Sequence, residues 1–165
     1  MTLLYFSMKM KKAVFSIEEI KRKLERYCVY QDRCHKEVEQ KLNEYNLIPE
    51  ARDMILLHLL QENFLNEERF AKSFARGKFK IKKWGRHRIV RELKIRDISE
   101  YNVKKGLEEI DADEYMEVLY TITEKKYNSF TKERELEKKR KLYSYLNYRG
   151  YETNLIYQVI NDLFE

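Results

Sequence analysis

The amino-acid sequence is dominated by a helical pattern that occurs three times, at a spacing of roughly 50 residues. In each copy two apolar residues stand four positions apart, which places both on one face of a helix. These pairs are Val38 and Leu42, Ile89 and Leu93, and Leu142 and Leu146. A helical pattern also precedes and follows each pair, so each copy holds three helices. Three short helices bury little core alone, and the copies are therefore expected to pack against one another along an array.

This repeat predicts an all-α protein in which three tandem three-helix units stack into an elongated, curved array. We expect an N-terminal extension at residues 1–15 and units at 16–65, 66–110 and 111–165. The composition fits a helix-rich protein, because the 165 residues include one Pro and four Gly. A single globule with one shared core is the alternative.

Local signals at the helix ends support this division. Ser16 and Glu19 have the spacing of a capping box, and Pro49 suits a first helical turn because its missing N–H would be unpaired there. Gly85 opens one helix and Gly150 closes another, and we interpret both glycines as structural. The helices are expected near residues 17–29, 33–45, 50–62, 67–83, 86–95, 99–109, 112–128, 132–148 and 153–164.

Positive charge is concentrated in the middle of the chain. Residues 69–96 hold twelve Lys or Arg and a single acid, Glu92, whereas the whole chain carries a formal net charge of +6. The segments on either side carry a small net negative charge. Like charges at this density repel one another unless a partner neutralises them, so the sequence predicts an anionic partner.

A helix over residues 66–83 would gather many of these cations on one side. At 100° per residue, five cations fall within a wedge of about 80°, while Phe70, Phe74 and Ile81 point the opposite way, toward a core. The next helix would likewise have its Lys and Arg residues on the outside. The cations of both helices would then lie close together on the surface. The residues expected to bind the partner are Arg69, Lys72, Arg76, Lys80, Lys83, Trp84, Arg86, Arg88, Arg91 and Lys94.

Two aromatic residues lie among these Lys and Arg residues. Phe79 and Trp84 have the chemistry to stack on nucleobases, as aromatic side chains do in proteins that bind single strands. Packing inside the protein is the alternative for both side chains.

The sequence lacks the residue constellations of an enzyme. It contains no glycine-rich phosphate-binding loop, no HExxH metal motif and no GxSxG nucleophile motif. His35, His58 and His87 are far apart, and the spacing of Cys28 and Cys34 matches no standard zinc site. One of these thiols is expected to be buried and the other to lie at the surface. We expect no catalytic residue, no metal site and no cofactor.

No apolar run approaches the roughly 18 to 20 residues that cross a bilayer. The first residues also lack the charged start and the small-residue cleavage site of a secretory signal. We therefore expect a cytoplasmic protein with no membrane partner. Since no dimerisation element stands out, we expect a monomer.

Four motifs occur in order along this helical frame. They are LNEERFA at residues 65–71, GRHRI at 85–89 followed by Glu92 and Leu93, KRKL at 139–142 leading to Leu146, and RGY at 149–151. In this order and at this spacing the chain resembles the RecX family of regulatory proteins, over about residues 16–165. It differs from the common family pattern at Glu67 or Glu68, at Arg86 and at Cys34, where Asp, Pro and Ser or Thr are frequent.

The resemblance implies a modulator of the RecA recombinase, acting in DNA repair, DNA recombination and the SOS response. It implies a slender all-helical protein that lodges in the groove of the RecA filament on single-stranded DNA. Such a protein inhibits filament growth, strand exchange and coprotease activity by occupancy. Its Lys and Arg side chains would contact RecA or the DNA phosphates. These contacts would position the protein without recognising the DNA sequence.

Two other functions fit the residues. A stand-alone DNA-binding regulator would use the Arg-rich helix after Gly85 as its recognition helix, although Asn and Gln for reading adenine are absent from that helix. A helical adaptor would instead recruit a protein partner through a tyrosine-rich end. Those tyrosines are Tyr143, Tyr145, Tyr148, Tyr151 and Tyr157.

Overall fold

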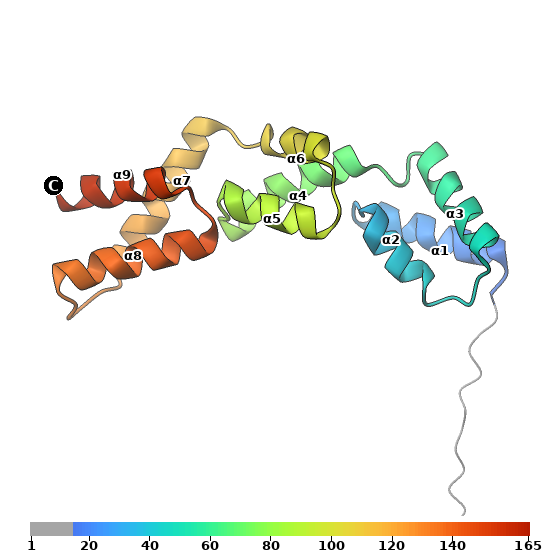
Figure 1. The fold of residues 1–165 in the computed structure, drawn as a ribbon, viewed down its shortest axis with the longest axis horizontal. Helices are drawn as coiled ribbons and strands as arrows, with labels where there is room; N and C mark the ends of the chain where they lie inside the picture. Colours follow the sequence, from blue (N-terminus) through green and yellow to red (C-terminus); the bar gives the residue numbers. More distant parts are fainter. Residues whose placement is uncertain (1–14) are drawn as a thin grey trace, which may run out of the picture.

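A computed structural model describes residues 15–165, and this part of the chain folds into nine helices without a strand (Figure 1). The helices are α1 (Ile17–Tyr30), α2 (His35–Leu42), α3 (Pro49–Gln61), α4 (Glu67–Lys82), α5 (Arg86–Ile95), α6 (Glu100–Leu107), α7 (Ala112–Tyr127), α8 (Glu135–Arg149) and α9 (Thr153–Phe164). Of the expected N-terminal extension, residues 1–14 lie outside the described part.

The helices form three successive groups along the long axis of an elongated molecule (Figure 1). We refer to α1–α3, α4–α6 and α7–α9 as the first, second and third helix groups. Contacts are made mainly within groups: α1 packs against α3, α4 against α5 and α6, and α7, α8 and α9 against one another. This arrangement confirms the predicted all-α helical repeat array. The unit boundaries at residues 16–65, 66–110 and 111–165 stay a prediction.

The helix ends follow the capping signals of the sequence. The Ser16 N–H donates a hydrogen bond to Glu19 Oε2 (2.8 Å), and the Glu19 N–H donates one to Ser16 Oγ (3.2 Å). Pro49 is the first residue of α3, and Gly150 ends α8 in the left-handed region with a φ of 87°. These three helix ends are therefore placed as the sequence predicts.

The start of α8 differs from the prediction by three residues. The segment before Glu135 forms a turn in which the Glu133 carboxylate accepts hydrogen bonds from the Thr131 and Lys132 N–H groups (3.0 and 3.1 Å). A hydrogen bond from Lys141, together with these backbone bonds, lowers the pKa of Glu133 to about 2. The side chain of Glu133 thus holds in a turn the residues that periodicity alone assigns to the helix.

The recurring apolar pairs form the centre of the core, and all six of their residues are fully buried. The core has two parts. Leu24, Ile55 and Leu59 join the first pair in a cluster confined to the first helix group. The other two pairs belong to one continuous cluster, shared by the second and third groups, that includes Tyr115 and Tyr151. The second and third groups are therefore joined by apolar packing.

Helix α4 buries Phe70, as predicted, but the rest of its buried face is displaced from the predicted one. Phe79 is fully buried with its ring 5.6 Å from that of Tyr115, whereas Ile81 is 77% exposed. The buried face runs through Ala71, Ala75 and Phe79, four residues apart, because α6 and the third group cover that side. The prediction that Ile81 lies in the core is wrong, and the burial of Phe79 excludes it from stacking on a nucleobase.

Both cysteines are buried. Cys28 packs in the core of the first group, whereas Cys34, just before α2, packs into the core shared by the second and third groups. Burial raises the pKa of the Cys28 thiol to about 11 and also raises the pKa of Cys34. The expectation of one thiol at the surface is therefore wrong, and Cys34 instead helps attach the first group to the second.

A polar cluster around Asp32 completes this attachment. Asp32 accepts hydrogen bonds from Arg69 Nε and Ser73 Oγ on α4, each at 2.7 Å. Partial burial of Asp32 opposes its ionisation, but the hydrogen bonds from Arg69 and Ser73 outweigh this effect and hold the pKa of the carboxyl below its ordinary value. Nearby, Lys36 Nζ donates to the Ile95 carbonyl oxygen (2.8 Å).

We expect the substitution Asp32→Asn to lower the free energy of unfolding at neutral pH by about 1 to 2 kcal/mol, because it removes a partly buried, charge-assisted pair. The native pKa of Asp32 is depressed, so its stabilisation is present above the unfolded pKa and is lost as pH falls through the native pKa. The difference between wild type and variant should therefore disappear in acid. Urea unfolding at a series of pH values measures it.

The matched control is Asp53→Asn, since Asp53 is exposed on α3 and makes no ion pair within the described residues. Equal losses of stability for the two variants at neutral pH would contradict the role given to Asp32.

Candidate functional site

The end of α8 meets the start of α5 through hydrogen bonds between their main chains. The Gly85 N–H donates to the Arg149 carbonyl oxygen (2.8 Å), and the His87 N–H donates to the Gly150 carbonyl oxygen (3.0 Å). The first N–H groups and the last carbonyl groups of a helix have no partner within their own helix, and here each set satisfies the other. The opposite ends of the two helix dipoles also face each other. We call this contact the α5–α8 joint.

Two glycines allow the main chains to approach at the α5–α8 joint. A Cβ atom on Gly85 would lie 2.2 Å from the Gly150 carbonyl oxygen, and one on Gly150 would lie 2.3 Å from the Cβ of Arg88. Gly150 also has the positive φ that L side chains rarely adopt. The interpretation of both glycines as structural is therefore confirmed.

The Tyr115 hydroxyl, on α7, connects the start of α5 to the residues that follow α8. It donates to Glu152 Oε2 (2.6 Å) and accepts a hydrogen bond from the Arg86 N–H (3.0 Å). The Arg86 guanidinium lies 3.8 Å from the centre of the Tyr115 ring and 3.3 Å from Glu152 Oε1. Burial, and then the hydrogen bond to Glu152, raise the pKa of Tyr115 far above its usual range, so the phenol remains a donor at all physiological pH values.

Cations and aromatic rings alternate on the outside of the joint. The Arg88 guanidinium lies 4.1 Å from the centre of the Trp84 ring and 4.9 Å from that of Tyr148, and it donates to the Tyr148 carbonyl oxygen (3.3 Å). Lys78 lies 5.2 Å from the Trp84 ring. Arg149 donates to the Lys82 carbonyl oxygen (2.7 Å). Cation–π contacts of this kind hold both the charge and the ring in place.

We call this region the joint surface, and it draws on α4, α5 and α8. Its residues are Lys78, Lys82, Lys83, Trp84, Arg88, Tyr145, Tyr148 and Arg149, together with the exposed Arg91, which follows Arg88 by three positions on α5 and so lies on the same side of that helix. Within residues 15–165, none of its cations forms an ion pair with a carboxylate. The guanidinium groups of Arg88 and Arg149 also each keep an Nε donor without a partner in this part of the chain. Tyr148 is 71% exposed. The joint surface therefore offers unneutralised cations beside one exposed ring, that of Tyr148, whereas Trp84 is half-buried against the core.

The remaining cations predicted to bind a partner each face an acid of this chain. These pairs are Arg69 with Asp32 (2.7 Å), Lys72 with Glu68 (2.6 Å), Arg76 with Glu109 (3.3 Å), Lys80 with Glu114 (3.6 Å), Arg86 with Glu152 (3.3 Å) and Lys94 with Glu100 (3.6 Å). All six acids lie outside the basic segment in the sequence. The fold itself therefore supplies part of the neutralisation that the sequence assigns to an outside partner.

The structure thus divides the ten predicted residues into two sets. Lys83, Trp84, Arg88 and Arg91 belong to the joint surface, whereas the other six cations are paired within the chain. Sequence reasoning missed the contribution of α8, because Tyr148 and Arg149 lie some 60 residues from Arg88 along the chain. The only sequence signal for this contact was the presence of a glycine at both helix ends.

The described residues contain no group of three or more His, Cys, Asp or Glu side chains placed to bind a metal ion. None of the helices in this range is both long and apolar enough to cross a membrane.

Comparison with protein families gives two matches in tandem. The model described as "RecX, second three-helix domain" matches residues 66–107, and the model described as "RecX, third three-helix domain" matches residues 113–160. The chain belongs to the RecX family. These matches cover α4–α6 and most of α7–α9, and hence both sides of the α5–α8 joint.

Relatives named regulatory protein RecX are similar over most of this chain. The protein of Lactobacillus gasseri is 25% identical over 137 residues, which cover 83% of this chain and 51% of that protein. The protein of Clostridium acetobutylicum is 29% identical over 137 residues, which cover 80% of this chain and 63% of that protein. This RecX-family chain therefore spans about half to two thirds of the length of these relatives.

Solved RecX structures share the fold. The crystal structure of RecX from Lactobacillus salivarius has a TM-score of 0.78 at 23% identity, and the match covers 89% of this chain and 96% of that chain. A second crystal structure, of a regulatory protein RecX, also has a TM-score of 0.78, at 20% identity, and the match covers 88% of this chain and 73% of that chain. The helical repeat array is thus the architecture of solved RecX proteins.

We expect Gly85→Ala to lower the free energy of unfolding by about 1 to 3 kcal/mol, because the new methyl group forces the α5–α8 joint apart. Chemical denaturation followed by circular dichroism measures this loss. Gly77→Ala is the control, since a Cβ atom at Gly77 meets nothing within 4 Å. Gly77 lies inside α4, so this change should raise stability by about 0.5 to 1 kcal/mol. A Gly85 variant as stable as wild type would refute the close approach at the joint.

Proposed function

We propose that this RecX-family protein regulates the RecA recombinase by binding its filament on single-stranded DNA. It occupies the filament groove and thereby inhibits the recombinase and coprotease activities, with consequences for DNA repair, recombination and the SOS response. The observation that carries the proposal is the joint surface, where unneutralised cations lie beside the exposed ring of Tyr148 in a chain of the RecX family. Family membership supplies the identity of the partner.

The chemistry of the joint surface suits a nucleoprotein filament. Lys and Arg side chains contact phosphates or acidic protein groups whatever the base sequence, and the exposed ring of Tyr148 can stack on an unpaired base. No Asn or Gln belongs to this surface to read adenine. The protein therefore binds the filament without sequence preference, and binding weakens as salt rises.

The mode of inhibition follows from the shape. The joint surface lies across the second and third helix groups, which share one core. An elongated body of this kind contacts several neighbouring subunits of a filament at once and obstructs their rearrangement. No bond is made or broken, so the protein needs no catalytic residue and no cofactor. It acts as a monomer in the cytoplasm, where RecA acts.

A stand-alone DNA-binding regulator is the second candidate, and the α5–α8 joint argues against it. A recognition helix contacts base edges with residues of its first turn. In α5 the N–H groups of Gly85, Arg86 and His87 are bonded to Arg149, Tyr115 and Gly150. The first turn of α5 is thus covered by the third helix group, so α5 is a poor recognition helix.

The double variant Lys82→Glu/Arg91→Glu tests the proposal, because both side chains are exposed and neither makes a contact that holds the described fold. Wild-type protein should inhibit RecA ATP hydrolysis on poly(dT) at stoichiometric amounts. The variant should require about tenfold more protein for the same inhibition. In anisotropy measurements with a dT oligonucleotide, the salt slope should fall by roughly 0.7 for each phosphate that the variant no longer neutralises.

Arg22→Glu/Arg26→Glu, on the exposed side of α1, makes the same change in net charge and should inhibit as wild type does. Absence of inhibition by wild-type protein would reject the proposed function. Equal inhibition by the two double variants would reject the joint surface as the contact, and strong preference for one duplex sequence would favour the second candidate.

A further inference from the structure

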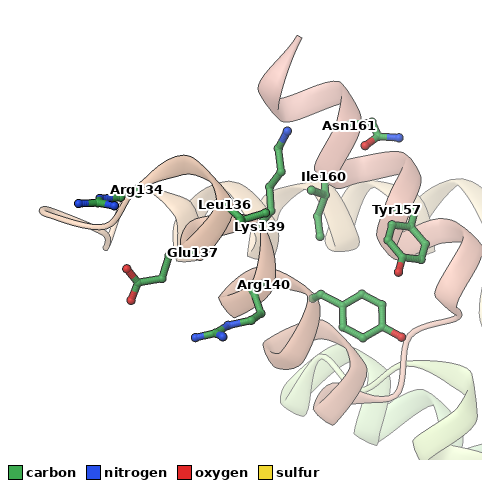
Figure 2. A pocket seen from close by; sticks show the side chains of 9 residues that line it. Arg134, Leu136, Glu137, Lys139, Arg140, Tyr157, Ile160 and Asn161 are labelled. Atoms are coloured by element: carbon green, nitrogen blue, oxygen red, sulfur yellow. The ribbon is translucent and has the colours of Figure 1, made fainter.

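A groove of about 690 Å³ lies between α8 and α9, away from the joint surface. Figure 2 shows the residues that line it, with Leu136, Glu137, Lys139 and Arg140 on α8 and Tyr157, Ile160 and Asn161 on α9. Arg134, just before α8, and Tyr143 complete the lining. No residue belongs both to this groove and to the joint surface. Its volume falls within the range of roughly 300 to 1,000 Å³ that is usual for ligand sites.

The floor of the groove is apolar and open to solvent. Leu136 is 81% exposed and Tyr157 is 55% exposed, although both side chains line a concave surface beside the buried Ile160. The rings of Tyr143 and Tyr157 lie 5.4 Å apart, one from each helix, and fix the spacing of the two walls. Large apolar side chains exposed together in a preformed groove mark an interaction site more often than isolated ones do.

The rim of the groove is positively charged. Its one carboxylate, Glu137, pairs with Lys141 (3.0 Å), and its Lys139 pairs with Glu135 (2.7 Å). Arg134 and Arg140 form no ion pair with any carboxylate of residues 15–165. Two guanidinium groups thus remain unneutralised beside the apolar floor, and both are free to form bidentate hydrogen bonds with carboxylates of a partner.

We propose that this groove binds an acidic peptide segment of a partner protein. An apolar side chain of the segment packs on Leu136, Tyr143 and Tyr157, and flanking carboxylates pair with Arg134 and Arg140. A groove between two helices that offers an apolar floor is the geometry that accepts an amphipathic helix. This site is separate from the joint surface, so it does not depend on the proposed contact with the filament.

A peptide fits these features better than a nucleic acid does. The two tyrosine rings already pack against each other at a tilt of 36°, so their facing surfaces are not free for bases. The rest of the floor is aliphatic, through Leu136 and Ile160, and offers no further ring on which a base could stack. Carboxylates presented on a helix with apolar side chains match both the floor and the rim.

The test uses the full chain and a fluorescein-labelled peptide of sequence EELFEELLEE, with anisotropy for affinity and amide chemical shifts for location. The peptide should bind and should shift amides of α8 and α9. The variants Arg134→Glu/Arg140→Glu and Leu136→Asn should each weaken binding, the first by about tenfold or more, because it turns attraction into repulsion. All three side chains are exposed, so the fold should tolerate these changes.

Three controls make the outcome decisive. Lys125→Glu/Lys132→Glu changes the net charge equally at exposed positions outside the groove and should leave binding unchanged. A peptide with the same apolar pattern and reversed charge, KKLFKKLLKK, should not bind. Absence of binding by the acidic peptide, equal binding of the basic one, or unchanged affinity in the groove variants would overturn the proposal. Shifts of α8 and α9 amides by a dT oligonucleotide would identify the groove as a nucleic-acid site instead.

Discussion

The main-chain hydrogen bonds between the end of α8 and the start of α5 are the constraint on which the rest of the arrangement depends. Buried N–H and C=O groups without partners are costly, and here two helix ends satisfy each other instead of being capped separately. This solution requires glycine at Gly85 and Gly150. It also brings the aromatic residues of the two helix groups into one core and sets Arg88 beside Tyr148. The shared core and the proposed binding surface therefore both depend on the α5–α8 joint.

Competition within the chain decides which cations remain available to a partner. Three of the acids that meet cations of α4, Asp32, Glu109 and Glu114, come from outside this helix and reach it only in the folded state, whereas Glu68 pairs with Lys72 within α4 itself. Most of these pairs are half exposed, and such pairs are weak. The joint surface differs because Lys78, Arg88 and Arg149 lie on aromatic rings, which hold these cations in place without cancelling their charge. A count of charges along the sequence cannot distinguish a cation that is paired with an acid of the chain from one that remains unpaired.

Local and repeated features could be predicted from the sequence, and long-range ones could not. The buried apolar pairs, the capping box at Ser16 and the two structural glycines follow from spacing within one or two turns of helix. The burial of Phe79 and the exposure of Ile81 depend on Tyr115 and α6, which lie far along the chain. The burial of both thiols was missed for the same reason, since the neighbours of Cys34 belong to other helix groups. Three of the nine residues of the joint surface lie on α8, to which no periodicity pointed.

The division of the core also has a consequence for biosynthesis. The first helix group completes its apolar cluster with residues that leave the ribosome before α4 does, so it can fold while the chain is still being made. The second group cannot do so, because Tyr115 and Tyr151, which close its core, are translated later. Until then Phe79 and its neighbours remain uncovered, and the nascent chain passes through a stage at which chaperones have an apolar target.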